Sequence, residues 1–367
     1  MSRPSKPQDY HVGWICAVQT EYVVACEFLD EEYPLLPASS LHDDNIYTFG
    51  RMGHHNVVIA CLPKGKYGLT SAASVAKDML RSFPLIRFGL MVGIGGGAPS
   101  PKHDIRLGDV VISSPMGRTG GVIHYEFGKT IQNQKFERTG ALDAPPPMLL
   151  MALSTIGARH ERKGHHIAES VNEMVERNSR LRKKYQRPDL GTDRLFKSSF
   201  IHPDPDQACD KVCTVETSQL IQRNERPADE DNPAIHYGLI ASADRLMKDA
   251  SVRDALARDE GVLCFEMEAA GLMDHFPCVV IRGICDYSDT HKNDIWQGYS
   301  AATAAAYAKE LLEVIPAAEL SSMPVASGLD QKASTDIPQA GGVTFNNYGK
   351  VGNQAAEQHF TGNVTFN

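Results

Sequence analysis

The amino-acid sequence predicts an α/β fold of three layers, in which a central twisted sheet, mixed but mostly parallel, is flanked by helices. The first observation is that apolar runs of strand length alternate with helical patterns along most of the 367 residues. The second is that these runs are continuously apolar, as in strands that are buried on both faces. The third is that several runs end on glycines or on an acid, at the edge where open α/β sheets place their chemistry.

The first part of the chain supplies strands and helices in alternation. Strands are expected at 12–18, 56–62, 87–97 and 110–113, and helices at 22–29 and 67–82. Glu21 lies at the turn from the first strand to the first helix. An acid at that place often only complements the helix dipole, so a structural role for Glu21 stays open. Residues 120–128, with His124, Tyr125 and Phe127, are expected to form a loop that covers a pocket.

The strand expected at 87–97 runs directly into glycines that include Gly95 and Gly96. Glycines at such a position let a ligand approach the backbone and leave amide N–H groups free to bind oxygens. Pro99 and Pro101 follow where a dinucleotide-binding motif would begin a helix. The sequence therefore favours contacts to a sugar or a base over a dinucleotide site.

Two stretches late in the chain carry acids. The small residues of 264–271 predict the beginning of a helix that carries Glu266 and Glu268. The strand expected at 279–286 ends on Asp286. If the first strand of the chain is parallel to this one, the acid that follows it lies at the same edge of the sheet. The alternative is structural, with Glu268 capping a helix and Asp286 opening a turn.

Residues 136–232 interrupt the alternation with a run of prolines, a polar helical stretch over 148–184 and an irregular region. We predict an insertion on the sheet scaffold. His202, Cys209 and Cys213 lie within it, but two cysteines four positions apart with one histidine are a weak signal for zinc. Neither a metal nor a cofactor is therefore predicted.

Composition excludes some classes of partner. The net charge of −8 and the isoelectric point near 6.0 argue against a surface that binds nucleic acid. No apolar run reaches membrane-spanning length, and the polar beginning of the chain lacks a signal-peptide core. The eight cysteines are scattered, several of them in apolar runs, as buried free thiols are. We expect a cytoplasmic protein that binds neither nucleic acid nor a membrane.

The end of the chain has a different character. An alanine-rich helix expected at 299–315 is followed by a flexible linker, 319–340, and by a β-prone tail, 341–367. In that tail Val343-Thr344-Phe345-Asn346 recurs as Val364-Thr365-Phe366-Asn367, a spacing of 21 residues (364 − 343). Such short units with glycine, asparagine and glutamine can stack in an amyloid-like manner. A disordered tail with a chance repeat is the alternative.

Four motifs in this order resemble the nucleoside phosphorylase/nucleosidase superfamily over most of 12–315: Val92-Gly93-Ile94-Gly95-Gly96-Gly97, Gly108-Asp109-Val110-Val111, Phe265-Glu266-Met267-Glu268 and Arg282-Gly283-Ile284-Cys285-Asp286. The stretches 236–242 and 285–292 look like the version found at the N-terminus of fungal NLR-type immune receptors. In those receptors a nucleotide-binding oligomerisation domain usually follows. Here 52 residues follow Ile315 (367 − 315) without a phosphate-loop motif, so we expect the tail in its place.

The resemblance implies a phosphorylase-like fold for 10–318 and gives the acids roles. Asp286 resembles the general acid that protonates a leaving purine, and Glu21 the acid that activates water. Glu268 matches the acid that grips the ribose hydroxyls, with Met267 under the sugar. The backbone near Leu246, after a strand expected at 235–241, lies against the base. The implied substrate-binding set is Gly95, Gly96, Leu246, Met247, Glu266, Met267 and Glu268.

The function implied is a purine nucleosidase that hydrolyses the N-glycosidic bond of adenosine or of an adenine nucleotide such as ATP. Candidate cations for nucleotide phosphates are Lys64, Lys66, Arg245 and Lys248. A homo-oligomer is expected, with a possible immune or cell-death role activated by an NLR-type receptor or by self-assembly through 341–367. The alternatives are a purine nucleoside phosphorylase, for which no obvious phosphate-binding loop is found, and a nucleoside-binding signalling module without turnover.

Overall fold

A computed structural model describes residues 4–36, 42–133, 136–204, 206–207, 209–213, 217–227, 230–292, 294–320 and 323–326. Residues 1–329 form one compact unit. The expected β-prone tail at 341–367 and most of the expected linker at 319–340 lie outside the described residues. The predictions for these two segments therefore stay predictions.

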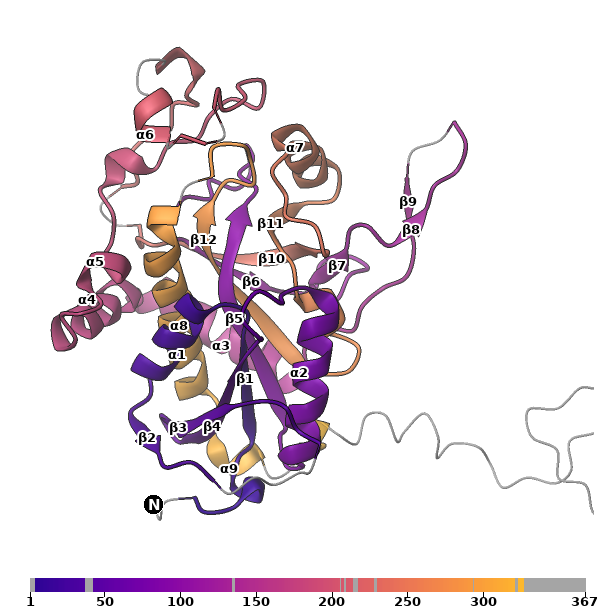
Figure 1. Ribbon diagram of the computed structural model, residues 1–367, viewed down its shortest axis with the longest axis vertical. Coiled ribbons are helices and arrows are strands. Elements are labelled where there is room, and N and C mark those ends of the chain that lie inside the picture. The colour runs from indigo at the N-terminus through magenta and orange to yellow at the C-terminus, as the bar shows by residue number, and fades with distance from the viewer. Residues whose placement is uncertain are drawn as a thin grey trace, which may run out of the picture. The chain divides into compact units, whose positions relative to one another are not determined.

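Among the described residues, ten strands form one mixed sheet, in the order β11-β10-β6-β12-β5-β1-β4-β3-β2 with β7 paired to β10 (Figure 1). Strands β1 and β12 both pair with β5 in parallel. Pairing of β11 with β5 closes β5, β12, β6, β10 and β11 into a ring. The predicted α/β class with a mixed sheet is confirmed. The strands are β1 Val12–Cys16, β2 Glu31–Tyr33, β3 Tyr47–Met52, β4 His55–Cys61, β5 Phe88–Gly97, β6 Val110–Ser113, β7 Val122–His124, β10 Ile235–Ser242, β11 Val262–Glu266 and β12 Cys278–Asp286, and β8 Gly128–Lys129 pairs with β9 Glu137–Arg138 outside this sheet.

Helices cover the sheet on both sides, with α8 and α1 on one side of β1 and β5 and α2 on the other (Figure 1). The small residues of α8 let it approach β12 closely, since a Cβ on Gly283 would lie 1.8 Å from the carbonyl oxygen of Ser300. The helices are α1 Gln19–Glu27, α2 Leu69–Ser82, α3 Pro147–Lys163, α4 Ile167–Arg177, α5 Arg182–Tyr185, α6 Cys209–Val212, α7 Ala250–Asp259, α8 Gln297–Val314 and α9 Ala317–Leu320, with short 3-10 turns η1 Pro7–Asp9, η2 Leu190–Thr192, η3 Thr217–Gln219, η4 Ala269–Gly271 and η5 Asp294–Trp296.

The segment predicted as an insertion, 136–232, has two parts that pack differently. Helices α3, α4 and α5 replace the single helical stretch expected at 148–184, and all three pack on α8. Leu149 and Val171 of these helices are buried in the same core as the sheet. The later part forms a small hydrophobic cluster of its own around Phe196. The first part is thus built into the main core.

Two local expectations were wrong, and two strands were not predicted. Glu266 ends strand β11, whereas a helix was expected to begin there, because the apolar residues 262–265 pair with β5 and β10. The loop expected at 120–128 contains strand β7, which pairs with β10. Strands β2 and β3 were not predicted, because these short strands near the sheet edge have partly exposed residues that break the apolar run.

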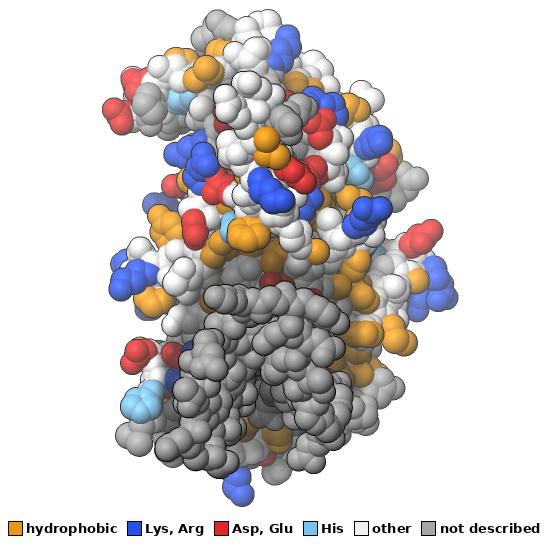
Figure 2. Space-filling model, turned by 90° about the vertical axis from the view of Figure 1, so that its right-hand side faces the viewer, with side chains coloured by type: hydrophobic (Ala, Val, Ile, Leu, Met, Phe, Trp, Pro, Cys, Tyr) orange, Lys and Arg blue, Asp and Glu red, His pale blue; other side chains and the backbone are white. Residues whose placement is uncertain are grey.

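Charged side chains of both signs lie on the described surface (Figure 2). Figure 2 shows acidic and basic side chains interspersed over the described upper part of one face, without a continuous basic surface there. Within the part of the chain that the structure describes, no helix combines the length and apolar character needed to cross a bilayer.

Candidate active site

A cavity of about 520 Å³ lies where β1, β5, β11 and β12 end. The strands are parallel at β1, β5 and β12, so the residues that follow them meet at one edge of the sheet. All nine residues singled out from the sequence line this cavity: Glu21, Gly95, Gly96, Leu246, Met247, Glu266, Met267, Glu268 and Asp286. Their common location is a structural fact, whereas their individual roles stay predictions.

Glu21 is buried in the first turn of α1 and joins two strands at the cavity. Its Oε2 accepts from the N–H groups of Ala17, at 2.7 Å, and Val18, at 3.1 Å. Its Oε1 accepts from the N–H of Ile94 at 2.8 Å. Burial raises the pKa of Glu21, although Arg282 and these N–H groups oppose the shift. A Cβ on Gly93 would lie 2.3 Å from Oε1, so a glycine is needed for this approach.

Arg282 is the group at the centre of the site that the sequence interpretation missed. It lies within β12 with a side chain only 1% exposed. Its Nη2 donates to Glu266 at 2.5 Å and to Glu268 at 3.4 Å, and its Nη1 lies 4.0 Å from Glu21. One guanidinium therefore serves three buried carboxylates. A signal was available, because a charged residue inside an apolar strand requires a buried partner of opposite charge.

Glu266 and Glu268 share Arg282 but differ in how fully their oxygens are satisfied. Glu266 accepts from the N–H groups of Glu268 and Ala269 as well as from the guanidinium. Among the described residues, the hydrogen bonds that Glu268 accepts are longer, at 3.4 Å from Arg282 and 3.3 Å from the N–H of Gly68. Burial raises the pKa of Glu268 to about 7, although Arg282 opposes the shift. The carboxylate of Glu266 is thus engaged by hydrogen bonds within the protein, whereas the carboxylate of Glu268 can still accept hydrogen bonds from a ligand in the cavity.

Asp286 ends β12 and faces a lysine that the sequence interpretation did not assign. Lys292 donates to Asp286 Oδ2 at 2.7 Å, and the N–H of Ser288 donates to Oδ1 at 2.9 Å. Burial alone would lower the pKa of Lys292, but the charge of Asp286 outweighs it and raises that pKa to about 12. Gly96 is required here, since a Cβ would lie 2.2 Å from Ser288 Oγ and 2.7 Å from Asp286 Oδ1.

Ser288 has an unusual environment for a serine. Its residue is 1% exposed, its φ is 52°, and its Oγ has no hydrogen-bond partner among the described residues. It also lines the cavity. A buried hydroxyl without a partner favours a role in binding a polar group of a ligand.

Apolar side chains complete the lining. Met247, Met267 and Phe265 line the cavity beside the acids, and Leu246 lies there with 46% of its surface exposed. The aromatic residues of the loop expected to cover a pocket are not among the described lining residues; Tyr125 instead packs edge-on against Phe265, with 5.6 Å between ring centroids.

The cations expected to meet nucleotide phosphates are distributed unevenly. Of the four candidates among the described residues, only Arg245 lines the cavity, and its guanidinium pairs with Glu126 at 2.5 Å. Its side chain is 80% exposed. The expected phosphate contacts therefore have at most this one group at the mouth of the cavity.

A larger cavity, of about 840 Å³, lies elsewhere, beside Pro99, Tyr237 and Leu263. Its acids are engaged in ion pairs with arginines, Asp104 with Arg106 and Asp254 with Arg253. The acids predicted to act in chemistry do not line it. The smaller cavity is therefore the candidate active site.

Comparison with known families agrees with this arrangement. A family model described as "Phosphorylase superfamily" matches residues 11–316. The chain belongs to the phosphorylase superfamily. Membership supports an enzyme that cleaves the glycosidic bond of a nucleoside, by transfer or by hydrolysis. The resemblance predicted from the four motifs is confirmed.

One curated relative and two solved structures are similar to this superfamily member. The chain is 46% identical over 314 residues to a nucleotide-binding leucine-rich repeat (NLR)-like protein of Hyaloscypha variabilis. This alignment covers 85% of the chain but only 30% of that protein. Futalosine hydrolase of Helicobacter pylori is 15% identical with a TM-score of 0.50, and 5'-methylthioadenosine/S-adenosylhomocysteine nucleosidase of Neisseria meningitidis is 17% identical with a TM-score of 0.51. Each alignment covers 83% of this chain and 98% of the other. At these identities the two structures show a shared fold.

Proposed function

We propose that this superfamily member is a purine nucleosidase, which uses water to cleave the N-glycosidic bond of an adenine nucleoside. The observation that carries the proposal is the convergence of Glu21, Glu268 and Asp286 in one cavity whose cations already have acidic partners. The nucleosidase folds among the similar solved structures support the same reaction class.

Asp286 and Lys292 supply the proton for the leaving base. Cleavage of the bond between the sugar and the purine builds positive charge on the sugar and negative charge on the base. The purine N7 becomes more basic as this charge develops, and the Asp286–Lys292 pair, with Nζ 2.7 Å from Oδ2, holds a proton that can be transferred to it. The free hydroxyl of Ser288 is in position to bind a polar atom of the base beside it.

Glu268 and Glu21 act on the sugar and on water. Glu268 keeps acceptor capacity for ribose hydroxyls, and its negative charge favours the cationic sugar of the transition state. Glu21 takes a proton from water as the water oxygen bonds to the anomeric carbon. Its raised pKa makes the carboxylate a stronger base than that of an exposed glutamate. The products are the free base and ribose.

The charge balance favours water over phosphate as the attacking group. Among the described residues, the cations that line the cavity are Arg245, Arg282 and Lys292, and each is paired with at least one acid. A phosphate ion placed beside Glu21 would meet buried negative charge without a free cation to bind it, which is unfavourable at low dielectric. A phosphorylase would need such a cation.

Product analysis tests the proposal. Purified protein is incubated with adenosine, inosine, guanosine and ATP, with and without phosphate, and bases and sugars are separated by chromatography. We expect adenine and free ribose from adenosine at a rate that does not depend on phosphate. Formation of ribose-1-phosphate only when phosphate is added would instead establish a phosphorylase.

Two matched substitutions test the assignment of the acid. Asp286→Asn is expected to lower kcat by about 10³-fold, within the range for loss of a general acid. Asp259→Asn, at an exposed aspartate paired with Arg258, is the control and is expected to retain full activity. Circular dichroism should show the same folded state for both variants, and an unchanged kcat for Asp286→Asn would contradict its role.

The identity to an NLR-like protein favours a wider role in such a system, in which nucleoside cleavage is switched on by assembly. The expected tail repeat at 341–367 is the proposed assembly segment. A chain that ends at Ala318 should keep basal turnover but lose assembly with a receptor, as measured by size-exclusion chromatography. Equal assembly by both chains would rule out this role for the tail.

A further inference from the structure

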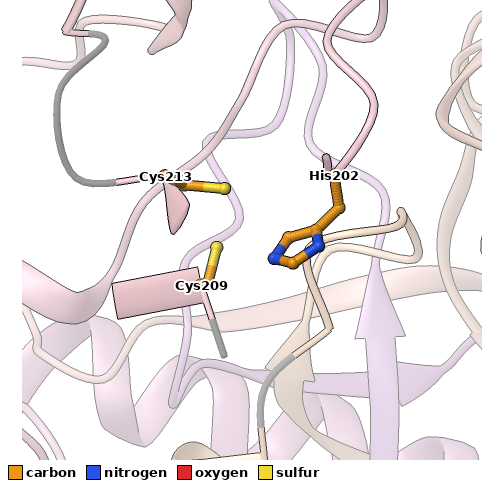
Figure 3. A group of neighbouring side chains, drawn as sticks. All are labelled: His202, Cys209 and Cys213. Atoms are coloured by element: carbon orange, nitrogen blue, oxygen red, sulfur yellow. The ribbon is translucent and has the colours of Figure 1, made fainter. Parts of the chain in front are cut away.

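A cluster of metal-ligand side chains lies outside the acid-lined cavity, in the part of the chain that follows α5. Cys209 and Cys213 are four positions apart at α6, which places both thiols on one side, and His202 comes from the preceding loop. Figure 3 shows the two sulfur atoms and the imidazole ring facing a common space. One ligand atom from each of the three residues lies within 4.8 Å of those of the other two. Both cysteines are buried and form no disulfide.

A second histidine next to this cluster has hydrogen-bonding capacity that the protein leaves unused. The side chain of His291 is only 3% exposed, and neither ring nitrogen has a hydrogen-bond partner among the described residues. Its ring centroid lies 5.3 Å from that of His202, whose own Nδ1 is also buried without a partner. Its Nδ1 lies 3.8 Å from Asp289 Oδ1. Buried imidazole nitrogens without partners are expected to have a ligand.

The segment that holds the cluster has little hydrophobic core of its own. Among the described residues, its hydrophobic cluster contains three buried side chains, Phe196, Cys209 and Cys213. In the described part of the segment, one isolated bridge, between Phe196 and Leu220, pairs its backbone across it. A unit of this size usually needs a metal or a disulfide in addition to its apolar contacts.

We propose that His202, Cys209 and Cys213 bind a zinc ion, and that His291 completes the tetrahedral coordination. Thiolate and imidazole are the ligands that zinc prefers in structural sites. Two thiolates and two neutral imidazoles leave the bound ion without net charge, which suits a buried site. Arg194 donates to the carbonyl of Cys213 at 3.4 Å and adds positive charge beside the thiolates.

The zinc ion connects this segment to the loop that follows Asp286. The N–H of His202 donates to Thr290 Oγ1 at 2.8 Å, and a small cavity is lined jointly by Cys209, His291 and Asp286. Because His291 lies on the loop that begins directly after Asp286, its coordination restrains that loop. An effect on turnover rests on the proposed function, but the zinc site itself does not.

Metal content and a cobalt spectrum test the site without reference to activity. Protein purified without chelators is expected to contain one zinc ion per chain by mass spectrometry of the metal. Replacement by Co²⁺ should produce thiolate-to-cobalt charge transfer and the intense visible bands of a tetrahedral site. The double variant Cys209→Ser/Cys213→Ser should contain no zinc, whereas Cys26→Ser, at a partly buried cysteine outside the cluster, should match the parent protein.

Other outcomes would overturn the proposal. Native protein that binds no zinc after equilibration with Zn²⁺, or a Cys209–Cys213 disulfide found in an unreduced digest, would exclude the site whatever the variants do. Zinc retained by the double variant would place the ion elsewhere. His291→Ala should weaken zinc binding by at least about tenfold in competition with a chelator, and unchanged affinity would exclude it as the fourth ligand.

Discussion

The acid-lined cavity and the cluster of His202, Cys209 and Cys213 are both polar and largely buried, but different parts of the fold hold them. The groups of the cavity lie at or beside four strands that are paired in register and packed in the main core. Those of the cluster lie on a four-residue helix and a loop, with a small apolar cluster around them. The paired strands of the sheet can hold like charges close together although this is electrostatically unfavourable. The side chains of the cluster, in contrast, depend on a bound ion to stay together.

This difference leads us to expect the largest effect from substitution at the centre of the cavity. Arg282→Met removes the guanidinium shared by Glu21, Glu266 and Glu268 and leaves these buried carboxylates without a cation. The free energy of unfolding should fall by about 3–5 kcal/mol, as is typical when one partner of a buried ion pair is removed. Turnover should be lost as well. Urea denaturation followed by circular dichroism measures the change.

Arg245→Met is the matched control at the mouth of the same cavity. Its side chain is 80% exposed and paired with Glu126, so the substitution should change the free energy of unfolding by less than about 0.5 kcal/mol. Equal stability of the Arg282 and Arg245 variants would show that the sheet, without the guanidinium, is sufficient to hold the acids together.

Glu21→Gln separates chemistry from structure at the first turn of α1, where it lines the cavity. Turnover should fall by about 10²–10³-fold through loss of the base that activates water. Glu21 accepts hydrogen bonds from three N–H groups, and the NH₂ of the glutamine must face at least one of them. This should lower the free energy of unfolding by about 1–3 kcal/mol. Steady-state kinetics and thermal denaturation measure the two effects. Reduced stability with full kcat would remove Glu21 from the mechanism.

The pH profile of kcat/KM should report Glu268, whose pKa is raised by burial to about 7. The carboxylate accepts from ribose hydroxyls more strongly than the protonated group does, and only the carboxylate carries the charge that favours a cationic sugar, so kcat/KM should rise as the pH increases through about 7. Stability should change in the opposite direction, because the folded state binds the proton more tightly than the unfolded chain. This stabilisation is complete below the ordinary value of 4.5 and is lost up to about pH 7. Glu268→Gln should abolish the rise in its residual activity, and a rise that persists would assign it to another group.

The alternation of apolar runs was sufficient to predict the fold class and the edge at which the acids meet. Continuous runs such as 279–286 are strands that are buried on both faces, and their polar end residues must lie at the sheet edge. The stretch around Glu266 was misread because Ala269, Ala270 and Gly271 suggest a helix, while the preceding residues form a strand. Tertiary pairing with β5 overrides this local preference.

The partners of the acids were harder to predict than the acids themselves. Arg282 could have been found, because an arginine inside an apolar strand needs buried acids nearby. Lys292 and Ser288 could not, since their contacts with Asp286 depend on a loop in which Ser288 adopts a positive φ of 52°. The proposed zinc ligands could be predicted in part. The spacing of three of them was visible in the sequence, but the contribution of His291 depends on how the two loops pack.

A change in global stability much smaller than that of Arg282→Met is expected from loss of the zinc ligands. The double variant Cys209→Ser/Cys213→Ser should unfold within about 1 kcal/mol of the parent protein, because local opening of a segment with few buried contacts leaves the main core intact. Trypsin should nevertheless cut faster at Lys197 and Lys211, which lie in this segment, and a zinc chelator should produce the same cleavage in the parent protein. If the double variant were destabilised as strongly as Arg282→Met, the segment would be part of the same cooperative unit as the sheet. The contrast between the two regions would then fail.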